Sequence, residues 1–313
     1  MNIRCYRKHN LSFIEVTNEK SLKVILCDFG ASIYRVYFND EPMNRTVRNN
    51  DNYLNPKCYY GKTIGRTSNR IGNSQILING SQYNLEENEP NKVLHGGPHG
   101  LSNKQFEYVV EGLSNYVLVK FKYLSKHLEG GYPGDLLVEV HYVIYKNIDR
   151  FDVKYFAISE DDTPVSLTNH TYFCLGEKEN SKLELMVRSF KHIKVDEALL
   201  PVANAVNIKK FDLNRYKPLK DEFDHYFYFS KVDYNLNNVS LKNEKFRLDI
   251  YTDYPGVQIY TSNSPTEFNL SDEVNELHDS VAIEPSEPFN KINILKAGHQ
   301  YRRNINYIFK KIK

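Results

Sequence analysis

The chain has 313 residues, of which 41% are hydrophobic and 13% aromatic, enough apolar material to bury a large core. Its 41 lysines and arginines nearly balance 39 acidic residues, so the formal charge is only +2, and the basic residues form no clustered face of the kind that binds nucleic acid. The composition therefore indicates a soluble globular protein and argues against a nucleic-acid partner.

The N-terminal segment and the cysteines indicate where the protein works. Residues 1–8 begin with charge and do not develop the apolar stretch of a signal peptide, and no later segment approaches the length of a membrane helix. We therefore expect a cytoplasmic protein with no membrane partner. The cysteines lack CxxC spacing and the density of a disulfide framework, so we expect free thiols and no metal site at Cys5, Cys27, Cys58 and Cys174.

Alternation of apolar and polar residues predicts β-strands along most of the chain. Residues 136–145 are a clear case, because Val138, Val140 and Tyr142 fall on one face. In chain order the predicted strands are residues 11–16, 23–27, 33–38, 116–123, 136–145, 151–158, 183–187, 226–229, 246–251, 257–261 and 305–309.

Turn-forming residues separate these strands. The Asn79-Gly80 pair within residues 76–83 predicts a tight hairpin, because both residues readily adopt positive φ. Residues 44–55 and 235–238 are rich in Asn and Asp and are interpreted as surface loops. With 24 tyrosines, 17 phenylalanines and no sustained helical period, the fold class is predicted to be all-β. Packed antiparallel sheets are expected, since one open sheet could not cover so much apolar surface.

Two titratable residues stand out against apolar surroundings. His170 lies within Thr-Asn-His-Thr, between strand-like neighbours, and a free imidazole titrates at roughly pH 6.5. Glu284 interrupts the apolar run of residues 281–285, and carboxylates are rarely buried without a reason. An imidazole and a carboxylate together can move protons at two positions of one substrate.

The loops supply further polar groups. His95 and His99 have the spacing of a helical metal pair, but the Gly-Gly-Pro between them excludes a helix, so we expect no metal there. No phosphate-binding loop, dinucleotide fingerprint or serine nucleophile motif is present, which leaves one imidazole and one carboxylate without an obvious nucleophile. Amides, carboxylates and Arg beside aromatic rings are typical of a sugar pocket, and the chain offers them at Asn69, Arg70, His95, His170, Tyr172, Asp224 and Gln258.

A series of motifs in sequence order resembles the aldose 1-epimerases, or galactose mutarotases. The resemblance covers nearly the whole chain, and seven motifs in the family's order are hard to obtain by chance. They are Gly65-Arg-Thr-Ser-Asn-Arg-Ile71, Leu94-His-Gly-Gly-Pro-His-Gly100, Glu129-Gly-Gly-Tyr-Pro-Gly134, Thr168-Asn-His-Thr-Tyr-Phe173, Phe223-Asp-His225, Pro255-Gly-Val-Gln-Ile-Tyr-Thr-Ser-Asn263 and Ile283-Glu-Pro285.

This resemblance implies a single domain over residues 1–313, folded as a large antiparallel β-sandwich of the galactose mutarotase supersandwich type. It also implies a cofactor-free isomerase that interconverts the α and β anomers of free aldohexoses. We expect the protein to be a monomer or weak homodimer. By position, His170 matches the family's general acid and Glu284 its general base. The positions that match sugar-binding residues are Asn69, Arg70, His95, Tyr172, Asp224 and Gln258. We further expect Asp224 or Glu284 to raise the pKa of His170 toward protonation.

Some positions depart from the family pattern, and two alternative functions are compatible with the sequence. Cys174 stands where the family usually has Asn, residues 200–204 lack the Thr-Gly that commonly follows Ile-Pro, and the loop after Glu284 is short. The first two departures do not touch the proposed acid or base, whereas the short loop concerns the rim of the pocket and hence the substrate range. A hexose-6-phosphate epimerase is one alternative, with cations from Arg66, Arg70 and Lys104. A non-catalytic sugar-binding protein is the other, although it would not need both His170 and Glu284.

Overall fold

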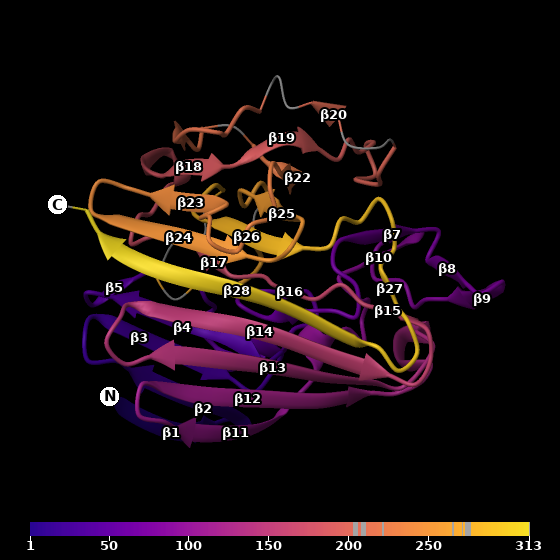
Figure 1. Ribbon diagram of the computed structural model, residues 1–313, viewed down its shortest axis with the longest axis horizontal. Coiled ribbons are helices and arrows are strands. Elements are labelled where there is room, and N and C mark those ends of the chain that lie inside the picture. The colour runs from indigo at the N-terminus through magenta and orange to yellow at the C-terminus, as the bar shows by residue number, and fades with distance from the viewer. Residues whose placement is uncertain are drawn as a thin grey trace.

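Antiparallel sheets make up most of the computed structural model, which describes residues 1–202, 206–207, 211–220, 222–264, 266–270, 272 and 277–312. Nine strands form the largest sheet, in the order β11-β12-β13-β14-β28-β24-β23-β18-β21. Figure 1 shows β28 crossing the middle of the molecule between β14 and β24. The strands are β11 (Glu107–Gly112), β12 (Tyr116–Ser125), β13 (Leu136–Tyr145), β14 (Arg150–Ser159), β28 (Gln300–Lys311), β24 (Phe246–Thr252), β23 (Val239–Lys242), β18 (Glu184–Val187) and β21 (Lys217–Pro218).

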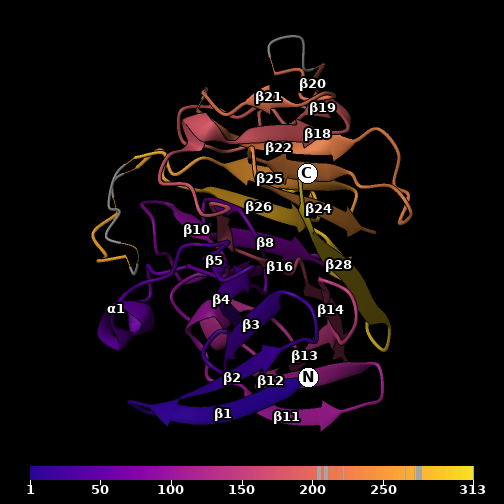
Figure 2. The same ribbon diagram turned by 90° about the vertical axis from the view of Figure 1, so that its left-hand side faces the viewer.

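Two further sheets pack against this one. Five strands follow one another in chain order: β1 (Asn2–Lys8), β2 (Leu11–Thr17), β3 (Leu22–Cys27), β4 (Ser32–Phe38) and β5 (Glu41–Pro42). Six strands run in the order β17 (Tyr172–Phe173), β26 (Val281–Ser286), β25 (Gly256–Tyr260), β22 (Asp224–Phe229), β19 (Ser189–His192) and β20 (Val206–Asn207). Figure 2 shows β22, β25 and β26 side by side.

The remaining elements are short. Two-stranded pairs join β6 (Thr63–Ile64) to β16 (Thr168–Asn169), β7 (Arg70–Gly72) to β10 (Lys92–Leu94), β8 (Gln75–Ile78) to β9 (Ser81–Asn84), and β15 (Thr163–Pro164) to β27 (Ile294–Leu295). The helical segments are α1 (Asn50–Leu54) and the 3₁₀ turns η1 (Leu101–Asn103), η2 (Glu129–Gly131) and η3 (Asn180–Lys182). Within the described ranges, no helix is long and apolar enough to cross a membrane.

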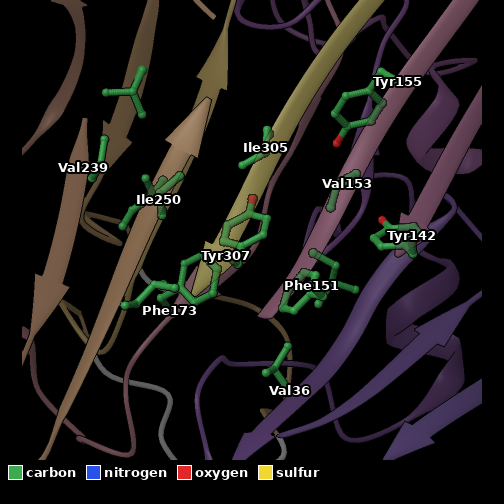
Figure 3. Packing of buried hydrophobic residues seen from close by; sticks show 14 of the residues in the cluster. Val36, Tyr142, Phe151, Val153, Tyr155, Phe173, Val239, Ile250, Ile305 and Tyr307 are labelled. Carbon is green, nitrogen blue, oxygen red and sulfur yellow. The ribbon is translucent and has the colours of Figure 1, made fainter. Parts of the chain in front are cut away.

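The main core lies between the sheets, where the apolar face of each strand points inward. On β13, Val138, Val140 and Tyr142 are all fully buried, as the period-two pattern predicts. Figure 3 shows Tyr142 with neighbours from β14 and β28, and it also shows Phe173 from the six-stranded sheet and Val36 from the five-stranded sheet. Because side chains from all three sheets meet in one cluster, the fold is a large antiparallel β-sandwich, which confirms the predicted class.

The predicted strands are confirmed, with ends that differ by a few residues. Each of the eleven predicted ranges overlaps one of β2, β3, β4, β12, β13, β14, β18, β22, β24, β25 and β28. The hairpin is also present, because Ile78 pairs with Ser81 across Asn79 (φ 51°) and Gly80 (φ 82°). All four cysteines are free thiols, three of them buried.

The interpretation of residues 44–55 as a surface loop is wrong. Residues 44–47 are buried, and α1 begins after Asn49, whose side-chain oxygen accepts a hydrogen bond from the Asn52 amide at 2.8 Å. Asn44 accepts from the backbone amide of Val36 at 2.7 Å, and Arg45 forms an ion pair with Asp272 at 2.9 Å. Polar residues can be buried here because partners inside the protein replace water.

Candidate active site

A pocket of about 230 Å³ opens over the six-stranded sheet and collects every site residue named from the sequence. Neighbouring strands β17, β26, β25 and β22 contribute Tyr172, Glu284, Gln258 and Asp224. Loops and short strands supply the rest: Asn69 and Arg70 at the start of β7, His95 after β10, and His170 between β16 and β17. The full lining is Tyr59, Asn69, Arg70, Leu94, His95, His170, Tyr172, Leu199, Asp224, Gln258, Tyr260, Ser264 and Glu284.

Period-two alternation explains why polar residues of β25 and β26 face the pocket. Val257 and Ile259 of β25, like Ile283 of β26, are fully buried in the main core, so the residues between them point to the opposite face of the sheet. Gln258 lies directly opposite Glu284 in the antiparallel register, which places both side chains on that face. The carboxylate that interrupts the apolar run is therefore the pocket-facing residue of a buried strand.

His170 is held by its backbone. Its amide donates a hydrogen bond to the Lys62 carbonyl at 2.9 Å, and its carbonyl accepts one from the Gly61 amide at 2.9 Å. The imidazole Nε2 lies 3.4 Å from Oε1 of Glu284, and the two side chains are 6% and 2% exposed. The acid and base candidates of the sequence are thus in contact and screened from bulk water.

Burial controls the protonation of this pair. Desolvation lowers the pKa of His170 to about 4, and it raises the pKa of Glu284 well above its usual range, with a further contribution from Asp224. The expectation that a nearby anion raises the pKa of His170 is wrong, because the loss of water around the imidazolium is the main cause of the shift and lowers the pKa. Burial therefore favours the neutral imidazole of His170 and the protonated carboxyl group of Glu284.

The pair nevertheless always contains one acid and one base. A neutral imidazole beside a carboxylic acid has the same number of protons as an imidazolium beside a carboxylate, and one proton transfer between the groups interconverts them. Two proton-transfer groups 3.4 Å apart can address two oxygens bonded to a single carbon.

Fixed hydrogen bonds orient the polar residues around this pair. Arg70 forms a two-point ion pair with Glu89, with Nε and Nη2 at 2.7 and 2.9 Å from the carboxylate oxygens. Gln258 donates from Nε2 to Oδ1 of Asp224 at 2.6 Å. Burial raises the pKa of Asp224, while Arg70 and Gln258 act in the opposite direction. The carboxyl, amide and guanidinium groups are therefore positioned before a ligand enters.

His95 is a hydrogen-bond donor to the pocket. Burial lowers its pKa well below the usual range, and the electrostatic effects of His170 and Arg70 act in the same direction, so its neutral form is favoured. Its Nδ1 accepts a hydrogen bond from the Asn69 backbone amide at 3.2 Å. The proton of the neutral ring is therefore on Nε2, which can donate to a ligand oxygen.

A metal site can also be tested at this cluster. Potential ligand atoms of His95, His170 and Glu284 lie within 4.8 Å of one another, and two imidazoles with one carboxylate form a zinc-type donor set. A metal-bound imidazole donates its other N–H to an acceptor. His95 has the reverse arrangement, with Nδ1 occupied by a donor and Nε2 protonated. The residues fit proton transfer better than metal binding, and His99 pairs instead with Glu86 at 3.1 Å on the surface.

Five residues of the pocket were not predicted from the sequence: Tyr59, Leu94, Leu199, Tyr260 and Ser264. Tyr260 could have been found, since it follows Gln258 by two residues on the same strand and shares its face. Leu199 precedes the segment that departs from the family pattern, of which Ala203 and Asn204 lie outside the described residues. Tyr59 belongs to no motif and carries no comparable signal.

Comparisons with known proteins agree on one family. A sequence model described as aldose 1-epimerase matches residues 12–308. A galactose mutarotase of Rattus norvegicus is 30% identical over 284 residues, covering 83% of this chain and 81% of that protein. An aldose 1-epimerase of Escherichia coli (strain K12) is 28% identical over 279 residues, covering 80% and 78%. A solved structure of galactose 1-epimerase from Lactobacillus acidophilus NCFM superposes with a TM-score of 0.90 at 22% identity, covering 100% of this chain and 99% of that one.

Proposed function

The chain belongs to the aldose 1-epimerase family, and from this premise we propose that His170 and Glu284 interconvert the α and β anomers of free aldohexoses by acid/base ring opening and reclosure. The protein is a carbohydrate isomerase. The observation that carries the assignment of the pair is the 3.4 Å contact between a buried imidazole and a buried carboxyl group in a polar pocket.

The proposed reaction needs two coordinated proton transfers. His170, as general acid, places a proton on the ring oxygen while Glu284, as general base, removes one from the C1 hydroxyl, so neither charged intermediate has to form alone. Both oxygens are bonded to C1, which matches two catalytic groups in contact with each other. Rotation about C1–C2 then presents the other face of the aldehyde, and reclosure reverses both transfers.

His170 and Glu284 exchange the roles of acid and base between ring opening and reclosure, which suits a buried pair. After ring opening His170 is neutral and Glu284 holds the proton, which is the form that burial favours. The imidazolium–carboxylate form is reached again on reclosure, when the ring oxygen loses its proton to His170 and Glu284 protonates the aldehyde oxygen. No proton has to be exchanged with bulk water during a turnover.

The other polar residues are proposed to hold the sugar. Arg70 and His95 present donors, Asp224 presents a carboxyl group, and Gln258 presents an amide. Tyr172 adds an aromatic ring to the wall of the pocket, and Asn69 adds a further amide. This assignment rests on their shared lining of the pocket and on the fixed bonds of Arg70 and Gln258.

Free sugars are favoured over hexose phosphates. Arg66 donates to the carbonyls of residues 125, 126, 133 and 134, and Lys104 pairs with Glu129 at 2.6 Å, so two of the three candidate phosphate-binding cations have partners elsewhere. Neither lines the described pocket, and Arg70 is already paired with Glu89. Several free cations would be needed to hold a dianion.

Residues 1–313 are proposed to form one domain, supported by a continuous core that includes residues from Ile14 to Phe309. We propose that this domain works in the cytoplasm as a monomer or weak homodimer, without a nucleic-acid or membrane partner.

The first expected result is metal-independent mutarotation. The protein should accelerate the change in optical rotation of freshly dissolved α-glucose and α-galactose, and it should do so equally after dialysis against a chelator, because proton transfer between side chains needs no Lewis acid. Polarimetry with a buffer control measures this. Rotation traces equal to the buffer for all sugars would favour the binding-protein alternative, and activity lost in chelator but restored by zinc would contradict the proton-transfer assignment.

The second expected result concerns pH. The pair is active while it holds one transferable proton. On the acid side kcat/KM should therefore fall only near pH 4, where protonation of His170 gives the pair a second proton. On the alkaline side it should persist above the usual carboxyl range, until Glu284 loses its raised-pKa proton. Polarimetric kcat/KM measured as a function of pH, and corrected for the spontaneous rate at each pH, gives the acid and alkaline limbs of the profile. An acid limb near the free-histidine value of roughly 6.5 would contradict this account.

A further inference from the structure

The His170 imidazole is packed against three aromatic rings, those of Tyr59, Tyr172 and His95. The ring of Tyr59 stacks on it with a centroid distance of 5.7 Å and an interplanar angle of 22°. Tyr172 packs on it at 4.8 Å and 33°, and His95 meets it edge-on at 5.2 Å and 90°. Tyr59 lines the pocket and belongs to none of the sequence motifs.

This packing bears on a difficulty of the site. The proposed cycle passes through an imidazolium at His170, yet burial disfavours that charge. The titratable groups around the ring are Glu284, which contacts Nε2, and the neutral His95 with the two tyrosines. Glu284 cannot compensate fully, because its own carboxyl group is buried and favours the protonated form.

Tyrosine faces can supply the missing stabilisation. A cation within about 6 Å of an aromatic centroid is attracted by the ring quadrupole, and the attraction grows when water is excluded. Both tyrosine centroids meet this distance from the imidazole. The attraction acts on the imidazolium and hardly at all on the neutral ring, so it favours the charged form that occurs during turnover.

Tyr59 is fixed in this position by other contacts. Its hydroxyl accepts a hydrogen bond from Nδ2 of Asn88 at 3.4 Å, and its ring meets His95 at 4.9 Å in a T-shaped arrangement. The His95 contact continues the aromatic packing around His170. The ring therefore has a fixed place beside the imidazole before a sugar enters.

We propose that Tyr59 is a positioning residue whose ring face holds the His170 imidazole and stabilises its protonated form during proton transfer. The proposal rests on the proposed role of His170 as general acid. It assigns Tyr59 an action through His170, in contrast to Gln258 or Asp224, which are proposed to touch the sugar.

Two substitutions at Tyr59 test this proposal. Tyr59→Leu removes the ring and keeps an apolar side chain, and it should lower kcat by roughly 3- to 30-fold with little change in KM. Tyr59→Phe keeps the ring and loses only the contact with Asn88, so its kcat should stay within about threefold of the original. Polarimetric kcat and KM for α-glucose separate the two variants.

A direct titration separates electrostatic support from a structural role. Nuclear magnetic resonance of isotope-labelled histidine in the sugar-free protein should place the His170 midpoint lower in Tyr59→Leu, by roughly 0.4 to 1.5 pH units, and leave it in place in Tyr59→Phe. Tyr260→Leu is the matched control, because it removes another pocket tyrosine whose ring packs on Tyr172 at 6.3 Å. It should leave the His170 midpoint unchanged.

The outcomes are distinct. A Tyr59→Leu protein with the original midpoint and kcat overturns the proposal, and so does a raised KM at unchanged kcat, which would make Tyr59 a platform for the sugar. A lowered kcat with an unmoved midpoint also overturns it, because only a structural role remains. If the unsubstituted protein lacks mutarotase activity, the proposed function fails, while the titration still tests the effect of the ring on His170.

Discussion

Replacing Glu284 by Gln is expected to lower the catalysed rate of mutarotation by roughly 10²–10⁴-fold, and replacing His170 by Asn should have an effect of the same size. Each change removes one partner of a proton transfer while keeping a polar side chain of similar size. The loss should appear mainly in kcat, since hydroxyl-binding residues such as Gln258 remain in place. Polarimetry with the spontaneous rate subtracted measures it.

Stability provides the control for this experiment. Because burial raises the pKa of Glu284, the folded state binds a proton more tightly than the unfolded state, and stability is lost as the pH rises through the folded-state pKa. A neutral Gln at position 284 escapes this loss, so Glu284→Gln should unfold at the same or a higher temperature than the original protein at alkaline pH. Near-normal turnover in this folded variant would show that another group is the base.

Replacing Gln258 by Leu is expected to raise KM by roughly tenfold or more, with a smaller effect on kcat. Gln258 donates to Asp224 at 2.6 Å, so the substitution removes one pocket amide and also releases a buried carboxyl group. A site that binds hydroxyl groups through such fixed partners loses discrimination when one partner is removed. The preference between glucose and galactose, which differ in the direction of one hydroxyl, should therefore change.

The measurement is kcat and KM for both sugars in Gln258→Leu, with Ser264→Ala as the matched control. Ser264 also lines the pocket but is exposed to solvent. A sugar hydroxyl that loses the serine hydroxyl can therefore bind water in its place, at little cost in binding free energy. Ser264→Ala should keep both constants within a few-fold. An unchanged KM and an unchanged sugar preference in Gln258→Leu would remove Gln258 from the proposed binding set.

Much of the architecture follows from local pattern. Strands with one apolar face, such as β13, are visible in the sequence because alternation reports which side meets the core. The same rule identifies Gln258 as pocket-facing between Val257 and Ile259. β26 was not predicted as a strand, because it is buried along its whole length and shows no alternation in burial. The edge strand β1 was not predicted either, because it is exposed along nearly its whole length and also shows no alternation in burial.

The gathering of the site was predicted only through family motifs. His170 and Glu284 are far apart in the chain, and their contact depends on how β17 and β26 pair, which no local pattern records. Protonation was predicted wrongly, because the sequence shows which charges are present but not how much water is excluded. Tyr59 was missed for a similar reason, since its significance comes from a ring contact in three dimensions.

The central claim is that His170 and Glu284 act as one proton-transfer unit, and the double variant His170→Asn/Glu284→Gln tests it most directly. Polarimetric kcat for the double variant should be within a few-fold of either single variant, because once one partner is lost the other has nothing to exchange protons with. A double variant whose loss equals the product of the two single losses would show independent contributions and contradict the account.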